Sequence, residues 1–143
     1  MVCFMAVYCI SGVFLALPDR TPELMMGVAT VESNCDPNAI GDNGNARGMF
    51  QIWEAFWIDG TEYLGVDWDY MTDVWDVDKS AQVVLAYWRR YAAFYIRKTG
   101  KPVTLKVISM LHNAGPYGWC DSNPERYENA LTYWRKVEKV LND

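Results

Sequence analysis

One short segment of the chain differs sharply in composition from what surrounds it. Residues 38–47 read Asn-Ala-Ile-Gly-Asp-Asn-Gly-Asn-Ala-Arg, and Asn, Asp and Gly at this density are typical of tight turns and short β-hairpins. No other segment carries a convincing β signal, and helix start and stop signals flank this one on both sides. The pattern predicts an α+β fold, mainly helical, with a small β-hairpin lobe.

The first expected helix leads directly into the turn-rich segment. Thr21 is expected as its N-cap and Pro22 as its first helical residue, and Asp36-Pro37 is expected to end it. Glu32 therefore falls at the end of a helix, immediately before the turns.

Three further helices are expected after the turns. The second begins near Asp78 and ends at Gly100, the third follows Lys101-Pro102 and breaks at residues 113–116, and the last is capped by Asn123. Apolar residues recur on them at helical spacing, which core packing explains. With no internal repeat and no long linker, residues 19–143 are expected to form one domain.

The chain begins with an apolar run, Val2 to Leu17, that contains no charged residue. This run is shorter than the about 20 residues that span a bilayer. We expect residues 1–18 to be a secretory signal peptide, with a buried N-terminal helix or an uncleaved membrane anchor as alternatives. The folded part is then secreted or extracellular and has no stable membrane span.

The cysteines divide into two pairs. Cys3 and Cys9 lie in the apolar run, whereas Cys35 and Cys120 lie in the body of the chain. A Cys35 to Cys120 disulfide is compatible with an oxidising compartment, and two free buried thiols are the alternative. No Cys or His spacing suggests a metal site, so we expect none.

Charge and aromatic content restrict the class of partner. The net charge of −5 argues against nucleic acid, because phosphate binding needs clustered Lys and Arg. Aromatic residues make up 15% of the chain, which is enough for a core and for stacking on sugar rings. Core packing is the more frequent role for any one of them.

Glu32 is the candidate catalytic group. Cleavage of a glycosidic bond usually needs a carboxylic acid that keeps its proton near neutral pH, in a partly apolar cleft. Glu32 follows the apolar residues Val28, Ala29 and Val31 and precedes turns that could form an opposite wall. Taken alone, a Glu at a helix end is more often a solvated surface group.

Several ordered motifs between Thr21 and Leu141 strengthen this interpretation. They include the stretch from Val31 to Asn38, then Gly48-Met49-Phe50-Gln51-Ile52, Phe56-Trp57-Ile58-Asp59-Gly60, Arg90-Tyr91, His112-Asn113-Ala114-Gly115-Pro116, and Leu131 to Val137. Together they resemble the lysozyme superfamily, most closely the invertebrate-type lysozymes, with elements shared with goose-type lysozymes and soluble lytic transglycosylase domains. Invertebrate-type lysozymes are usually denser in cysteines than this chain.

The resemblance implies a set of site residues. Glu32 corresponds to the general acid, and Asp42 matches the second carboxylate with a small shift in spacing; an ordinary turn residue is the alternative for Asp42. Trp57 is a weaker candidate for the cleft wall, as is Tyr91. The implied substrate-binding residues are Phe50, Gln51, Ile52, Tyr91, His112, Asn113, Ala114 and Gly115.

The implied function is that of a lysozyme, or muramidase. Such an enzyme hydrolyses the β-1,4 bond between N-acetylmuramic acid and N-acetylglucosamine in bacterial peptidoglycan, here as a monomer without a cofactor, with chitin oligosaccharides as a further substrate left open. A lytic transglycosylase giving 1,6-anhydro products and a non-catalytic glycan-binding protein are the alternatives, and a phage endolysin is an alternative setting. A Ser/His/Asp hydrolase is set aside because the chain has no Gly-x-Ser-x-Gly.

Overall fold

The computed structural model describes residues 17–143. The expected signal peptide therefore lies outside the described residues except for its last two positions. Within the described part of the chain, no helix has the length and apolar character needed to cross a bilayer.

The described residues form a mainly helical domain with one small antiparallel sheet, which confirms the expected α+β class. Strand β1 pairs with β2 with Ile40 opposite Arg47 and Gly41 opposite Ala46, so the hairpin lies within the expected segment 38–47. The elements in order are α1 (Thr21–Ser33), β1 (Ile40–Gly41), the 3-10 helix η1 (Asp42–Gly44), β2 (Ala46–Arg47), α2 (Glu54–Leu64), α3 (Tyr70–Asp73), α4 (Val77–Thr99), α5 (Leu105–Ala114), the 3-10 helix η2 (Gly118–Cys120) and α6 (Pro124–Asn142).

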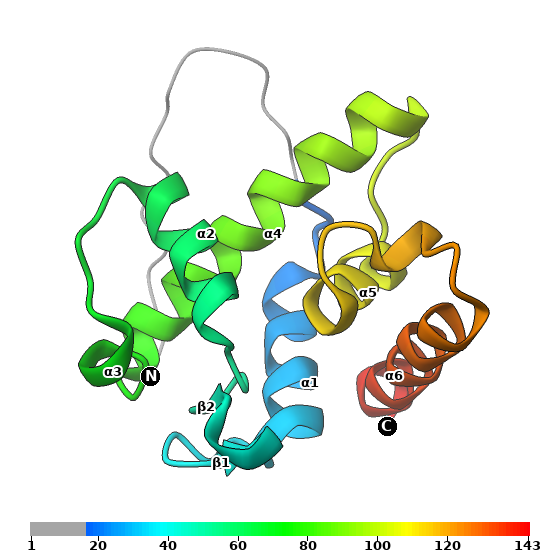
Figure 1. Cartoon of the computed structure of the whole chain (residues 1–143). Coiled ribbons are helices and arrows are strands. Elements are labelled where there is room, and N and C mark those ends of the chain that lie inside the picture. Colours follow the sequence, from blue (N-terminus) through cyan, green and yellow to red (C-terminus); the bar gives the residue numbers. More distant parts are fainter. Residues whose placement is uncertain (1–16) are drawn as a thin grey trace.

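The helices pack as two groups that share the central core. Helix α2 packs along the long helix α4, while α1 and α5 both pack against α6. In Figure 1 the hairpin lies beyond the C-terminal end of α1, between that helix and the start of α2. The core includes Leu24 of α1, Trp57 of α2, Trp88 of α4 and Ile108 of α5, all 1% exposed or less.

Helix α2 was not among the expected helices. Its sequence carries Gly60 in its middle, and no side chain caps its first turn. The structure gives the glycine a packing role. A Cβ atom at Gly60 would lie 2.7 Å from both Cγ1 and the carbonyl oxygen of Val83, so only glycine lets α2 approach α4 this closely. Tertiary packing here outweighs local helix propensity.

Two predicted N-caps were wrong by one or two residues. The cap of α1 is Arg20, and Thr21 is the first helical residue, with its hydroxyl donating to the Pro18 carbonyl. The cap of α4 is Asp76, whose carboxylate accepts from the Lys79 N–H at 2.9 Å. The Asn123 cap and the end of α4 at Gly100 are confirmed.

The structure decides whether Cys35 and Cys120 form a disulfide. Both Cys35 and Cys120 are free thiols, so the Cys35 to Cys120 disulfide is not formed. Neither thiol is fully buried: Cys35 is partly exposed and Cys120 is exposed. The fold of this domain is therefore held by its core rather than by a crosslink between these two residues.

Candidate active site

Helix α1 presents Glu32 in its last turn. The helix ends because Asn34 adopts a left-handed backbone conformation, with φ of 55°, and its N–H donates back into the helix. Ser33, next to Glu32, donates its hydroxyl to the Met49 carbonyl at 2.7 Å. This bond ties the end of α1 to the chain that follows the hairpin, and so fixes the position of Glu32 relative to the opposite wall.

The surroundings of Glu32 favour its protonated form. Its side chain is only 18% exposed. Burial raises the pKa of Glu32 from 4.5 to about 7, and the negative charge of Asp42 acts in the same direction. Tyr133 donates its hydroxyl to Oε1 of Glu32 at 2.8 Å, and this bond and the positive charge of Lys136 partly oppose the rise in pKa. Near neutral pH Glu32 can therefore both hold a proton and release it.

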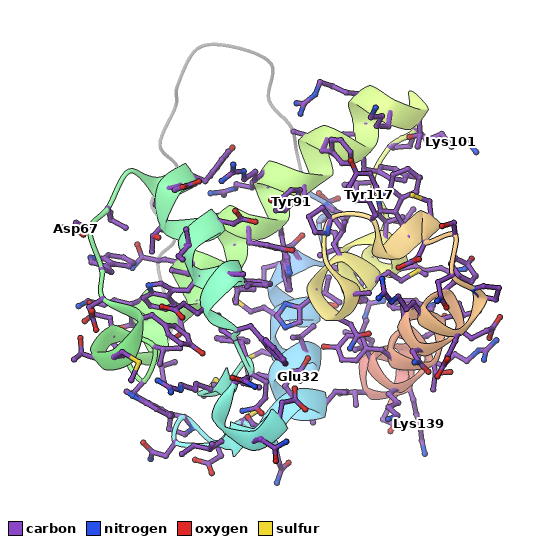
Figure 2. All side chains as sticks on the ribbon, viewed as in Figure 1. Glu32, Asp67, Tyr91, Lys101, Tyr117 and Lys139 are labelled. Atoms are coloured by element: carbon purple, nitrogen blue, oxygen red, sulfur yellow. The ribbon has the colours of Figure 1, made fainter. Side chains whose placement is uncertain are left out.

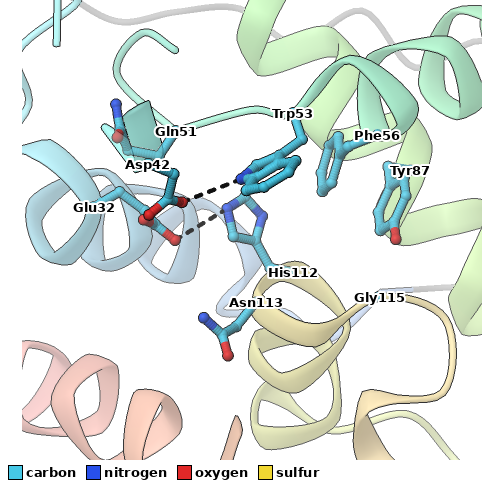
Figure 3. A pocket seen from close by; sticks show the side chains of 9 residues that line it. All are labelled: Glu32, Asp42, Gln51, Trp53, Phe56, Tyr87, His112, Asn113 and Gly115. Carbon is cyan, nitrogen blue, oxygen red and sulfur yellow. Dashed lines mark hydrogen bonds and ion pairs between the residues drawn. The ribbon is translucent and has the colours of Figure 1, made fainter. Parts of the chain in front are cut away.

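His112 of α5 supports Glu32 from inside the protein. Its Nδ1 accepts from the Trp88 indole N–H at 3.2 Å, which leaves Nε2 to donate to the Phe50 carbonyl at 3.2 Å. Burial lowers the pKa of His112 to about 4, so the ring is neutral near pH 7. Nε2 also lies 3.6 Å from Oε1 of Glu32 (Figure 3), a contact with a neutral ring rather than an ion pair.

The hairpin side of the cleft contributes Asp42. Asp42 and Asn43 both have positive φ, 48° and 56°, as expected for Asp and Asn in a tight turn. The exposed Asp42 carboxylate accepts from the indole N–H of Trp53 at 3.3 Å, and Figure 3 shows it pointing toward the same space as Glu32. The turn conformation and the orientation toward Glu32 are thus both present.

Gln51 holds the hairpin in place. Its side-chain amide donates to the carbonyl oxygens of Ala39 and Gly48, at 3.2 and 3.0 Å. The side chain passes so close to Gly41 that a Cβ atom there would lie 2.3 Å from Oε1 of Gln51. A larger residue at position 41 would therefore displace a residue that lines the cleft.

A cleft of about 450 Å³ lies between these groups. In Figure 3 the rings of Trp53, Phe56 and Tyr87 follow one another along one side of it. Phe56 stacks on Tyr87 with ring centroids 3.6 Å apart. Such aromatic faces are suited to sugar rings. The residues that line the cleft are Glu32, Asp42, Gln51, Trp53, Phe56, Tyr87, His112, Asn113 and Gly115.

Several predicted site residues lie elsewhere. Phe50 and Ile52 belong to the core and are 2% and 1% exposed. Gln51, which lies between them in the sequence, lines the cleft instead. Trp57 is also core, at 1% exposed, with its indole N–H bonded to the Trp68 carbonyl. Neither these three nor the exposed Ala114 lines the cleft.

Tyr91 also lies away from the acid. It donates its hydroxyl to the Asp59 carboxylate, and burial together with that carboxylate raises its pKa to about 12. Figure 2 shows Tyr91 on α4 at a distance from Glu32. Its ring contacts that of Tyr87, so Tyr91 can only support the cleft wall from behind.

Sequence reasoning assigned no role to four residues that the structure brings to the site: Trp53, Phe56, Tyr87 and Tyr133. Phe56 and Tyr133 belong to the quoted motifs, but no role was assigned to either. An aromatic residue at helical spacing gives no signal that separates a cleft wall from a core. Among residues 17–143 there is no group of three His, Cys, Asp or Glu side chains arranged to hold a metal ion.

Comparison with known proteins agrees with this geometry. The family model described as Destabilase matches residues 22–140. The chain is 34% identical over 115 residues to Lysozyme 1 of Crassostrea virginica, an alignment that covers 78% of this chain and 54% of that protein, so the chain spans about half the length of this relative. The order of motifs, the helical domain with its small hairpin and these two matches together establish that the chain belongs to the Destabilase family, the invertebrate-type lysozymes.

Proposed function

We propose that this protein is a muramidase that hydrolyses the β-1,4 bond between N-acetylmuramic acid and N-acetylglucosamine in peptidoglycan. The observation that carries the proposal is the state of Glu32, whose pKa of about 7 results from burial beside an open cleft. A general acid is most effective when its pKa lies near the working pH. The similarity to a protein named Lysozyme 1 supports the same substrate class.

The proposed reaction uses both carboxyl groups. Glu32 donates its proton to the glycosidic oxygen as the bond to the anomeric carbon breaks. Asp42 attacks that carbon, or stabilises its positive charge, from the opposite wall. Water then gives its proton to the Glu32 carboxylate and its oxygen to the anomeric carbon. Where Asp42 has bonded to that carbon, this bond breaks as the oxygen of water attacks, so the Asp42 carboxylate is released, Glu32 regains its proton and a reducing sugar leaves.

We also propose the setting in which the enzyme acts. Residues 19–143 are the catalytic domain, which acts as a secreted monomer without a cofactor, and residues 1–18 are a signal peptide. The exposed ring of Trp53 and the partly exposed ring of Phe56 carry sugar units along the cleft, and the buried ring of Tyr87 supports Phe56 from below. Chitin oligosaccharides, which share the N-acetylglucosamine unit, are a second class of substrate to test.

Mass spectrometry of purified peptidoglycan, digested by the wild type and by Glu32→Gln, tests the proposal. The substitution keeps the shape of the side chain and removes its titratable proton. Reducing muropeptides should appear with the wild type, and the rate with Glu32→Gln should fall by about 10³-fold, within the range for loss of one general acid. Glu128→Gln, an exposed position on α6, serves as the matched control.

Each result of this digestion has a defined meaning. Products with 1,6-anhydro ends from the wild type would assign the chain to the lytic transglycosylase reaction. Equal digestion by the wild type and by Glu32→Gln would refute the role of Glu32. If the wild type binds glycan but does not cleave it, the protein is a glycan-binding member of its family and not an enzyme.

A further inference from the structure

A second hollow, of about 210 Å³, lies next to the cleft on the hairpin side. Trp53, which is 49% exposed, belongs to the lining of both, so one ligand can pass from the cleft across the indole into this hollow. The other lining residues come from the hairpin and from the beginnings of α2 and α3. They are Gly44, Asn45, Arg47, Glu54, Ala55, Tyr70 and Met71.

Arg47 supplies the positive charge of this hollow. Its Nε donates to the Gly44 carbonyl at 3.0 Å, its Nη1 lies 2.9 Å from the sulfur of Met71, and its guanidinium lies 5.1 Å from the centre of the Tyr70 ring. In residues 17–143, no carboxylate oxygen comes within 4.0 Å of Arg47. A guanidinium has five N–H donors, so three remain for a ligand.

The platform under Arg47 is rigid. The Tyr70 hydroxyl lies 2.8 Å from the Ile52 carbonyl and 3.1 Å from the Asn45 carbonyl, and its ring is 8% exposed. The Arg47 guanidinium is thus held in one orientation and keeps free N–H donors. Such a group can bind a carboxylate through two parallel hydrogen bonds. Arg47 thus has the features of a binding residue rather than of a solvated surface charge.

The geometry points to Arg47 as a binding site for a carboxylate of the peptide that peptidoglycan carries on its muramic acid, with the glycan itself in the cleft. This inference rests on the proposed function, since it takes the ligand to be peptidoglycan. It makes Arg47 a specificity residue, because chitin carries no carboxylate. A protein of net charge −5 needs such a local cation to hold an anionic substrate.

Glu54 limits what the hollow accepts. Its carboxylate belongs to the same lining, and its negative charge and the positive charge of Arg47 act in opposite directions on the pKa of Tyr70, which burial raises. A negative charge at Glu54 opposes the binding of an anion in the same hollow. Removing the charge of Glu54 should therefore strengthen binding of the anionic ligand.

Calorimetry in the Glu32→Gln background, where cleavage cannot interfere, tests this site. The ligands are the disaccharide tetrapeptide purified from peptidoglycan, the same compound with its carboxylates amidated, and chitotriose. Arg47→Met keeps an unbranched side chain over Tyr70 and should weaken binding of the disaccharide tetrapeptide by about 10-fold, the effect of losing a charge-assisted contact. Binding of the amidated compound and of chitotriose should change by less than about 2-fold, because neither presents the charge that Arg47 recognises.

Two more variants complete the design. Glu54→Gln should tighten binding of the disaccharide tetrapeptide by about 3-fold, whereas Glu128→Gln, with the same change in net charge far from the hollow, should not. Equal losses for chitotriose and for the disaccharide tetrapeptide in Arg47→Met, or equal affinity of the amidated and free compounds for the Arg47 protein, would overturn the inference. Turnover by the wild type is measured separately, so failure to cleave counts against the muramidase and not against the Arg47 site.

Discussion

The two walls of the cleft place a carboxyl group in opposite environments. On the helical wall Glu32 is largely buried. It accepts a hydrogen bond from the Tyr133 hydroxyl, and the neutral ring of His112 lies beside it. On the hairpin wall Asp42 is exposed at a turn and meets only the edge of the Trp53 indole. Burial on the helical wall raises the pKa of Glu32, and the hairpin wall does not bury Asp42 in the same way.

The two walls also differ in how they are held. The helical wall rests on buried hydrogen bonds, in which the Trp88 N–H, the His112 ring and the Phe50 carbonyl form one chain. The hairpin is a two-residue pairing that Gln51 and Ser33 tie to its surroundings. Substitutions on the helical wall should therefore affect both stability and activity, whereas those on the hairpin wall should affect mainly activity.

The largest expected effect that sharpens this comparison comes from Asp42→Asn. Asparagine tolerates the left-handed backbone at this position and can still accept the Trp53 N–H, so only the charge is lost. We expect kcat on peptidoglycan to fall by two to three orders of magnitude, a range typical for loss of one positioned catalytic group, with Tm unchanged. Full activity of Asp42→Asn would mean that Glu32 works alone, and 1,6-anhydro products should then be found.

The next effect concerns the pH dependence of stability. Because the folded state holds the Glu32 proton up to a pKa of about 7, against 4.5 for the ordinary group, the stability linked to that proton is fully present below pH 4.5 and is lost as pH rises through 7. The loss is on the order of 3 kcal/mol. Glu32→Gln removes this dependence, so its advantage over the wild type in urea unfolding should grow from pH 4.5 to 8.

A comparison of the two proteins is needed because His112 titrates as well. The pKa of His112 is lowered to about 4, so its contribution to stability is present above its ordinary pKa of 6.5 and is lost as pH falls through 4. This contribution is common to the wild type and to Glu32→Gln and cancels in their difference. A difference that stays constant from pH 4.5 to 8 would show that Glu32 is not buried in the way described.

The hairpin wall is built from local turn signals and the helical wall from long-range packing, and only the local signals could be read from the sequence. Turn residues and helix caps are local signals. The hairpin at residues 38–47, the end of α4 at Gly100 and the start of α6 at Asn123 were therefore predicted correctly. The motif around Glu32 pointed to the acid through resemblance to a family. Helix α2 was missed, and its close packing on α4 at Gly60 is a long-range contact that no local pattern records.

The division between cleft and core could not be predicted for the same reason. Phe50, Gln51 and Ile52 are consecutive, yet only Gln51 lines the cleft, and that depends on how the chain leaves the hairpin. Tyr133 reaches Glu32 across a sequence separation of 101 residues. Contacts of this kind arise from the packing of α1 against α6, which spacing within either helix does not specify.

A smaller effect is expected from Tyr133→Phe, which removes one hydrogen bond from the helical wall. Because that bond favours the Glu32 carboxylate, its loss should raise the pKa of Glu32 further and move the alkaline limb of kcat/KM to higher pH. The free energy of unfolding should fall by about 1 kcal/mol. Tyr127→Phe, elsewhere on α6, is the matched control. An alkaline limb that moves to lower pH would contradict the assigned direction of this hydrogen bond.

The smallest effect should come from Trp53→Phe on the hairpin wall. Phenylalanine keeps an aromatic face toward the cleft and removes only the N–H that Asp42 accepts, a bond of 3.3 Å between exposed groups, so kcat should fall by about 3-fold with KM nearly unchanged. If the indole acts by orienting Asp42, its loss should matter in the wild type and have no further effect once Asp42→Asn is present. Kinetics of the double variant measure this coupling directly. Additive losses would instead mean that Trp53 does not orient Asp42 and acts only by stacking on a sugar, so the hairpin wall would act through two separate contacts.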